Sequence, residues 1–183
     1  MRARLLLAAT LVNALGSTLL AWGLLLAPLR QATGQSLAAL SLVPALALVG
    51  FTLGMLLHHR LLARVAPAPL AAGLLLLAAA GHGLFLLWPG YAALLLGYGA
   101  LFGLTNGVGY GLAVALARAA ARPGESGPVG LPIAAYAAPG IVFSALALGG
   151  FAPPDATAAA WSKFVSFVPM KIRSPTMRGT VYW

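Results

Sequence analysis

The sequence predicts an all-α fold, a polytopic membrane helical bundle of five transmembrane helices. The 183 residues are 61% hydrophobic and only 7% charged, whereas soluble domains carry charge at about a quarter of their positions. The apolar residues gather in runs long enough to cross a hydrocarbon core of about 30 Å. Basic residues stand between these runs, which is typical of topology signals.

The first predicted span covers residues 5–29 and follows Arg2 and Arg4 directly. Signal peptides and signal anchors share such a basic start. This apolar run is longer than the roughly 7 to 15 residues of a signal-peptide core, and no convincing cleavage site follows it. We therefore expect an uncleaved first helix.

The other predicted spans cover residues 36–57, 69–89, 91–117 and 130–151. The fourth has no charged residue and carries a glycine at every fourth position: Gly99, Gly103, Gly107 and Gly111. On a helix these glycines form one bare strip, called the glycine strip below, which a neighbouring helix can approach backbone to backbone. Lipid offers the backbone no other hydrogen-bond partner, so the helix tolerates these glycines.

The arginines predict the topology. Two precede the first span, one follows it, two follow the second, none follows the third and two follow the fourth. This alternation places the N-terminus and the loops at 58–68 and 118–129 in the cytoplasm. We expect a multi-pass protein of the cell membrane with the lipid bilayer as a partner. The net charge of +9 does not indicate a nucleic-acid partner, because the basic residues do not form one polar patch.

Residues 152–183 differ from the rest of the chain. Both lysines, Lys163 and Lys171, lie there, and no apolar run in this segment is long enough to span a membrane. We expect a poorly ordered basic tail after a transmembrane bundle formed by residues 1–151. The change in composition suggests a foreign or out-of-frame ending.

Polar residues inside the spans are the functional candidates, because lipid makes them costly unless they face other helices or water. Asn13 and Ser17 share one face of the first span. Tyr98 and Thr105 share a face of the fourth span that is turned away from the glycine strip, and Asn106 lies at its edge. We predict that these five residues line a substrate pathway for a small solute. Hydrogen bonding between helices is the alternative interpretation.

His82, in the third span, completes this set of candidates. An imidazole can titrate near neutral pH, so proton coupling is one interpretation. A neutral imidazole bonded to a neighbouring helix is the other. The predicted spans contain no aspartate or glutamate, so a carboxylate proton relay is not expected.

Enzyme signatures are absent from the sequence. It contains no HExxH zinc motif, no GxSxG elbow and no phosphate loop ending in GK[ST]. The two acids, Glu125 and Asp155, lie outside the spans. His58 and His59 are too few ligands for a metal site and are interpreted as a helix end. We expect no enzymatic activity, no cofactor and no metal.

The segment GMLLHHRLLAR, which runs from Gly54 to Arg64, resembles the loop after the second helix of major facilitator superfamily transporters. That loop has the pattern G-x-L-a-D-[RK]-x-G-[RK]-[RK]. The resemblance identifies Gly54, His58, Arg60 and Arg64 as a gating-loop motif. His58 stands where the family has an acid and Leu61 where it has a second glycine, so the charge contact made by that acid is not carried over.

Residues 103–110, GLTNGVGY, and 127–130, GPVG, resemble more particularly the oxalate/formate antiporter and monocarboxylate branch. The arginine that many of its members have in the fourth helix is absent. The resemblance covers about residues 1–150, or five of the six helices of a partial N-terminal half of the major facilitator fold. It implies transport of a small organic solute, with carboxylates among the candidates, by alternating access between two halves.

A chain with five such helices is expected to be a truncated transporter that does not transport alone. Its partner would be a missing second half or another copy in a homo-oligomer. The alternative function is a non-transporting membrane module that binds a partner through the glycine strip. An inactive gene fragment is a further alternative.

Overall fold

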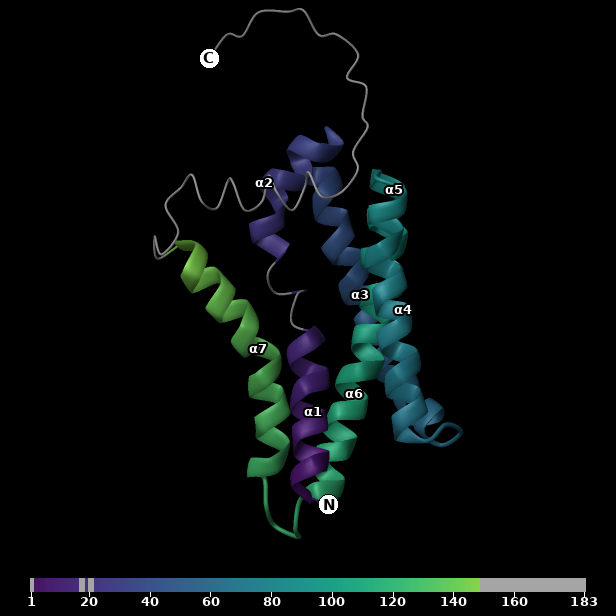
Figure 1. Cartoon of the computed structure of the whole chain (residues 1–183), viewed down its shortest axis with the longest axis vertical. Helices are drawn as coiled ribbons and strands as arrows, with labels where there is room; N and C mark the ends of the chain where they lie inside the picture. Colours follow the sequence, from purple (N-terminus) through teal and green to yellow (C-terminus); the bar gives the residue numbers. More distant parts are fainter. Residues whose placement is uncertain (1, 17–18, 20–21, 149–183) are drawn as a thin grey trace, which may run out of the picture.

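The computed structural model describes residues 2–16, 19 and 22–148, and all regular structure in this part of the chain is helical (Figure 1). The elements are α1 (Arg2–Gly16), α2 (Trp22–Thr33), α3 (Leu37–Leu62), α4 (Pro67–Leu87), α5 (Tyr91–Ala93), η2 (Leu94–Phe102), α6 (Gly103–Ala120) and α7 (Gly127–Leu148). The predicted all-α class is therefore confirmed for the described residues. The predicted tail lies outside them, as do the last residues of the predicted fifth span.

Among the described residues, three helices are long and apolar enough to cross a membrane: Leu37–Leu62, Pro67–Leu87 and the continuous Tyr91–Ala120. The first predicted span, 5–29, corresponds to two separate helices, with α1 ending at Gly16 and α2 beginning at Trp22. The helix α7 has 22 residues, and its segment Gly127–Ala138 is apolar. The count of five spans stays a prediction.

The helix formed by α5, η2 and α6 occupies the centre of the bundle. Of its most apolar 18-residue window, 61% is buried, compared with 28% for α3 and 11% for α4. The outward faces of α3 and α4 expose large apolar side chains, including Leu87 at 87% and Leu76 at 73% exposure. Leucines exposed in this density are expected on a surface in contact with lipid rather than water.

Local sequence signals explain where the helices begin and end. Ser36 caps the start of α3, because its hydroxyl accepts a hydrogen bond of 3.1 Å from the Ala39 backbone N–H. Pro67 begins α4, where its missing N–H costs nothing. Gly34, directly after α2, has a φ of +67°, a conformation that favours glycine. The Tyr91 hydroxyl donates to the Ala39 carbonyl at 2.7 Å and ties the start of the central helix to α3.

The start of α1, the α3–α4 connection and the α6–α7 connection all lie at one end of the bundle (Figure 1). An ion pair between Arg2 and Glu125 joins the first and last of these segments. Glu125 also accepts the backbone N–H of Arg122 at 3.1 Å, which fixes the loop around it. The two basic loops that the sequence assigns to one side therefore share an end of the bundle.

The glycine strip packs against α3. A β-carbon added at Gly103 would lie 2.6 Å from Cα of Ala47, and one added at Gly107 would lie 2.8 Å from Cα of Phe51. Real β-carbons essentially never approach other atoms closer than 3.0 Å. The two backbones are therefore in direct contact, as in small-residue interfaces between membrane helices.

The contact between α3 and α6 is reciprocal. Gly50 on α3 faces the backbone of Leu104, and Gly54 faces the backbone of Leu104 and Val108. Higher-numbered residues of α3 meet higher-numbered residues of α6, so the two helices run parallel. Gly54, predicted in the gating-loop motif, thus lies inside a helix interface.

The segment η2 is a π-helix of nine residues within the central helix. It meets α4 through Gly97 and Gly81, whose backbones touch: a β-carbon on Gly81 would lie 2.6 Å from the Gly97 carbonyl oxygen. A π-helix has i to i+5 hydrogen bonds and frequently occurs at functional sites. A π-helix has more residues per turn than an α-helix. Side chains at the start of the central helix therefore point in directions, relative to those of α6, that a regular α-helix would not give.

Candidate functional site

A polar junction lies between α1, α6 and α7, and it consists of Asn13, Asn106 and Tyr136. Asn13 is 1% exposed, and its side-chain amide donates to the carbonyl oxygen of Pro132 on α7 at 2.8 Å. Asn106 is 8% exposed and donates to the Gly16 carbonyl and to the Tyr136 hydroxyl, each at 3.0 Å. Three helices are therefore joined by uncharged hydrogen-bonding groups.

The junction exists because α1 and α6 pack closely. Ala9 of α1 is fully buried against Ala113 and Ala117 of α6. Such small side chains bring the helix axes near one another. Farther along the same interface there is no space for a β-carbon at Gly16, because the Asn106 side chain occupies it. Alanine or a larger residue at position 16 would therefore displace Asn106.

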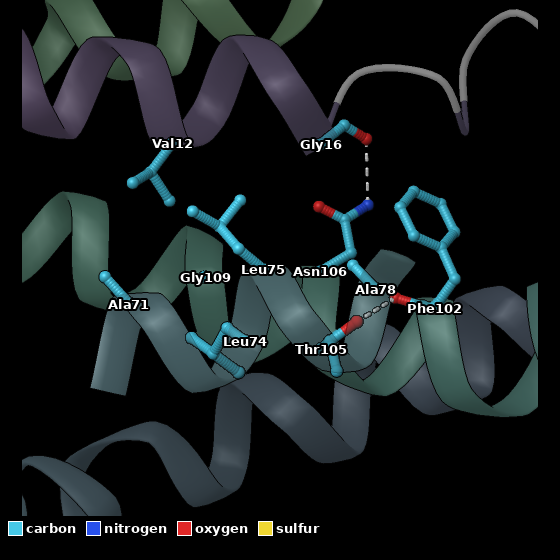
Figure 2. A pocket seen from close by; sticks show the side chains of 10 residues that line it. All are labelled: Val12, Gly16, Ala71, Leu74, Leu75, Ala78, Phe102, Thr105, Asn106 and Gly109. Atoms are coloured by element: carbon cyan, nitrogen blue, oxygen red, sulfur yellow. Dashed lines mark hydrogen bonds between the residues drawn. The ribbon is translucent and has the colours of Figure 1, made fainter. Parts of the chain in front are cut away.

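Thr105 and Asn106 line a small cavity between α1, α4 and α6 (Figure 2). Its volume is about 60 Å³, and most of its wall is apolar, contributed by Val12, Leu74, Leu75 and Phe102 among others. Small-molecule sites usually measure about 300 to 1,000 Å³. The cavity in this arrangement therefore admits only a chemical group of a few atoms.

The hydroxyl of Thr105 bonds within its own helix. It lies 3.0 Å from the carbonyl oxygens of both Leu101 and Phe102. Such bonding back to the preceding turn satisfies a buried hydroxyl without a partner helix. Thr105 thus contributes a wall of the cavity rather than a link across the junction.

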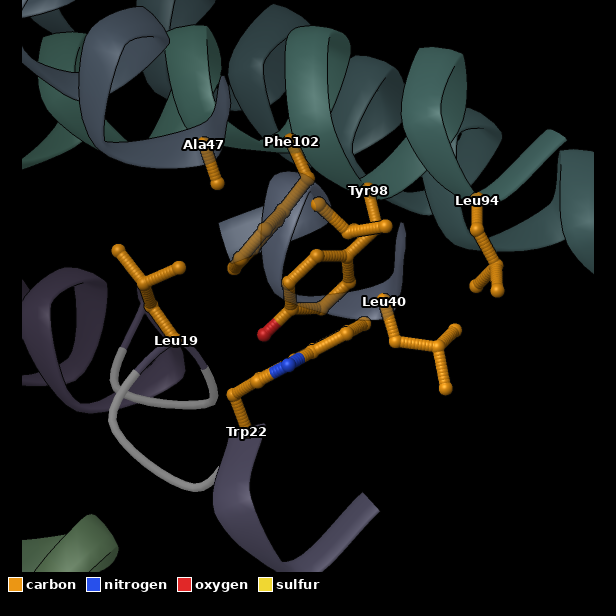
Figure 3. Packing of buried hydrophobic residues seen from close by; sticks show 8 residues of the cluster. Leu19, Trp22, Leu40, Ala47, Leu94, Tyr98 and Phe102 are labelled. Carbon is orange, nitrogen blue, oxygen red and sulfur yellow. The ribbon is translucent and has the colours of Figure 1, made fainter. Parts of the chain in front are cut away.

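Tyr98 packs in a different cluster, together with Trp22 and Phe102 (Figure 3). The ring of His82 lies against Tyr98 and Phe102 at the side of this cluster. The Tyr98 ring lies 5.0 Å from Trp22 and 4.9 Å from Phe102, measured between ring centroids. The imidazole of His82 meets Phe102 edge-on at 4.7 Å, and its Nδ1 lies 2.8 Å from the Ala78 carbonyl oxygen of its own helix. The structure does not bring these two predicted pathway residues to the junction.

The predicted gating-loop residues separate into two groups. His58 packs against α6, where a β-carbon on Gly111 would lie 2.7 Å from the His58 β-carbon. Arg60 and Arg64 are exposed at the end of the bundle that carries both basic loops. Among the described residues neither arginine forms an ion pair. Ser17, predicted in the pathway, lies outside the described residues.

Tyr136 was missed by the sequence analysis. Its hydroxyl accepts from Asn106, and its ring lies 5.3 Å from Tyr110 and 6.0 Å from Phe51. A signal was present, because a tyrosine in the interior of an apolar run needs a hydrogen-bond partner. Pro132 and Tyr136 are also spaced four residues apart, so they lie on one face of α7.

The described residues contain no cluster of three or more histidine or acidic side chains that could hold a metal ion. The junction has amides, a phenol and backbone carbonyls as its polar groups. These groups can bind a solute by hydrogen bonds. Comparisons with known protein families, with curated proteins and with solved structures found no match to this chain.

Proposed function

We propose that this chain is a membrane transport protein of the major facilitator type, in which α1 and α6 line the pathway of a small organic solute. The observation that carries the proposal is the polar junction. Asn13 and Asn106 are buried within apolar helices, where polar side chains are costly and mark candidate solute pathways. The order of sequence motifs described above also supports it.

Alternating access needs an opposing wall, because the cavity beside Thr105 and Asn106, at about 60 Å³, is too small to hold a solute by itself. The proposed partner is a second half or a second copy of the chain. The proposal includes placement in the cell membrane, with the first residues in the cytoplasm. Six of the seven described arginines support this orientation, because they lie at the end that holds the two basic loops: Arg2, Arg4, Arg60, Arg64, Arg118 and Arg122.

The competing function is a membrane module that binds a partner through the glycine strip. In the folded chain this strip faces Ala47 and Phe51 of α3. A partner helix would have to displace α3 before it could reach the glycines. The packing of α3 therefore favours the transporter proposal.

The orientation can be measured by cysteine labelling, because the natural sequence contains no cysteine. Single variants Arg64→Cys and Gly124→Cys should react with a membrane-impermeant thiol reagent from the same side of the bilayer. Gln35→Cys and Gly90→Cys should react from the other side. Reaction of positions 64 and 124 from opposite sides would contradict both the topology and the proposed kinship.

The pathway can be tested at Thr105, which is 5% exposed and lines the cavity. The variant Thr105→Cys should react with a small water-soluble thiol reagent, because a solute pathway admits water. Leu76→Cys is the matched control: it is on the outward face of α4 and should stay unreacted in lipid although it is 73% exposed. Equal lack of reaction at both positions would overturn the transporter proposal in favour of a packed module.

A further inference from the structure

An open groove lies where α2 leads into α3, at the end of the bundle away from the basic loops (Figure 1). Its volume is about 540 Å³, which falls within the roughly 300 to 1,000 Å³ typical of ligand sites. A β-carbon added at Gly23 would meet nothing within 4 Å, so this side of α2 is bare. Five residues of α2 and the first residue of α3 line the groove: Gly23, Leu26, Ala27, Arg30, Gln31 and Leu37.

The groove changes from apolar to polar along α2. Its five α2 residues stand at positions i, i+3, i+4, i+7 and i+8, so they share one face of the helix. Arg30 follows Gly23 by seven residues and lies about 10 Å farther along the helix, toward the end of the bundle (Figure 1). In a bilayer the apolar part of the groove is therefore the deeper part, and Arg30 and Gln31 lie nearer the headgroups. A phospholipid places its acyl chains and its phosphate in the same order.

Arg30 has no counterion within the described part of the chain. The ion pair present there joins Arg2 and Glu125 at the other end of the bundle. The side chains of Arg30 and Gln31 are exposed and make no hydrogen bond to another described residue. The whole sequence has two acidic residues against eleven lysines and arginines, so a second copy of the chain offers little negative charge. Lipid phosphates are the anions available at the membrane surface.

We propose that this groove binds an anionic phospholipid of the leaflet opposite the basic loops. The phosphate accepts hydrogen bonds from the Arg30 guanidinium and the Gln31 side-chain amide, and an acyl chain lies over the apolar part of the groove. A guanidinium can donate to a phosphate from two nitrogens at once, which fixes the headgroup better than a point charge does. The groove lies outside the polar junction, so the lipid site does not depend on the transport proposal.

The net charge of the headgroup decides the selectivity of the groove. Phosphatidylglycerol offers a phosphate without a cation. Phosphatidylcholine carries a quaternary ammonium that offsets the attraction between its phosphate and Arg30. The attraction of one basic residue to an anionic lipid surface corresponds to roughly a fivefold preference. A preference of this size is therefore expected for phosphatidylglycerol.

The test uses phosphatidylglycerol and phosphatidylcholine probes with the same diazirine-labelled acyl chain. The full chain is placed in phosphatidylcholine nanodiscs that contain a small fraction of one probe and is irradiated, and the labelled peptides are identified by mass spectrometry. The phosphatidylglycerol probe should label residues 22–37 at least fivefold more than the phosphatidylcholine probe. Equal labelling by the two probes would overturn the proposal.

Inorganic phosphate distinguishes a lipid site from a site for the free anion. It lacks an acyl chain, so an excess of it should leave the labelling of residues 22–37 unchanged relative to chloride at the same ionic strength. Loss of labelling in phosphate alone would mean that the groove binds the free anion, and the lipid assignment would be wrong.

Two substitutions of Ala27 test the charge in the groove. Ala27 is exposed and precedes Arg30 by three residues, so the carboxylate of Ala27→Glu can pair with the guanidinium and compete with the phosphate. Labelling of residues 22–37 should fall at least fivefold. Ala27→Gln has nearly the same shape without the charge and should keep the labelling of the natural chain. Equal labelling in these two variants would contradict the role of charge.

Arg30→Gln assigns the binding to this arginine. It should lower labelling by the phosphatidylglycerol probe to the level of the phosphatidylcholine probe. Arg64→Gln is the control, because Arg64 is also exposed, lies at the other end of the bundle and forms no ion pair with a described residue. It should leave the labelling of residues 22–37 unchanged. Undiminished labelling in Arg30→Gln would refute the site.

Discussion

Gly107→Leu is expected to prevent the chain from folding. A β-carbon at this position would lie 2.8 Å from Cα of Phe51, and leucine adds three further carbons. Ordinary overpacking costs about 1–3 kcal/mol, because side chains rotate away. Here the obstacle is backbone, so α3 and α6 would have to separate along their contact. The measurement is the fraction of protein recovered as a monodisperse helical species after detergent extraction.

Gly83→Leu is the matched control for that experiment. Gly83 is a glycine within α4, another apolar helix, and an added β-carbon there meets nothing within 4 Å. Leucine also has a higher helix propensity than glycine. This variant should be recovered as well as the natural chain. Equal recovery of Gly107→Leu and Gly83→Leu would show that the glycine strip has no packing role.

Asn106→Leu should give the second-largest effect, a loss of about 1–3 kcal/mol in the free energy of unfolding. The substitution keeps the approximate volume but removes both donors, which leaves the Gly16 carbonyl and the Tyr136 hydroxyl without them. Interhelical hydrogen bonds in membranes average about 0.6 kcal/mol each, and the unpaired partners add to that cost. Reversible unfolding in a titration with dodecyl sulfate measures the loss.

Thr52→Val is the control for Asn106→Leu. The Thr52 hydroxyl is exposed and bonds only the Leu48 carbonyl oxygen of its own helix, at 2.9 Å. Its removal should change the unfolding free energy by less than about 0.5 kcal/mol.

A double-mutant cycle that combines Asn106→Leu with Tyr136→Phe isolates the contribution of the Asn106–Tyr136 hydrogen bond. A coupling energy of zero would mean that this bond contributes nothing to the junction.

Much of the helical architecture could be predicted from the sequence, because lipid permits few backbone structures. Long uncharged runs and the arginines between them are sufficient to predict an all-helical chain with membrane-length helices. The structure confirms both for the described residues. The predicted span at 5–29 corresponds to two described helices, α1 and α2, because the length of an apolar run alone does not state where a helix ends.

The site could be predicted only in part, for a geometric reason. Asn13 and Asn106 were selected from burial costs alone, and the structure brings both to one junction. Tyr98 was assigned to the same pathway by stepping about 100° per residue along a regular α-helix. The π-helix Leu94–Phe102 does not follow that step, and Tyr98 packs against Trp22. Tyr136 was missed because periodicity does not state which helices become neighbours.

The direct contact between the backbones of α3 and α6 has a mechanical consequence. At most helix interfaces, side chains lie between the two backbones, and changes of rotamer allow small sliding movements. At Gly54 and Gly107 no side chain separates the backbones of α3 and α6. A tilt of α6 is therefore expected to carry α3 with it, so that the two helices move as one rigid unit.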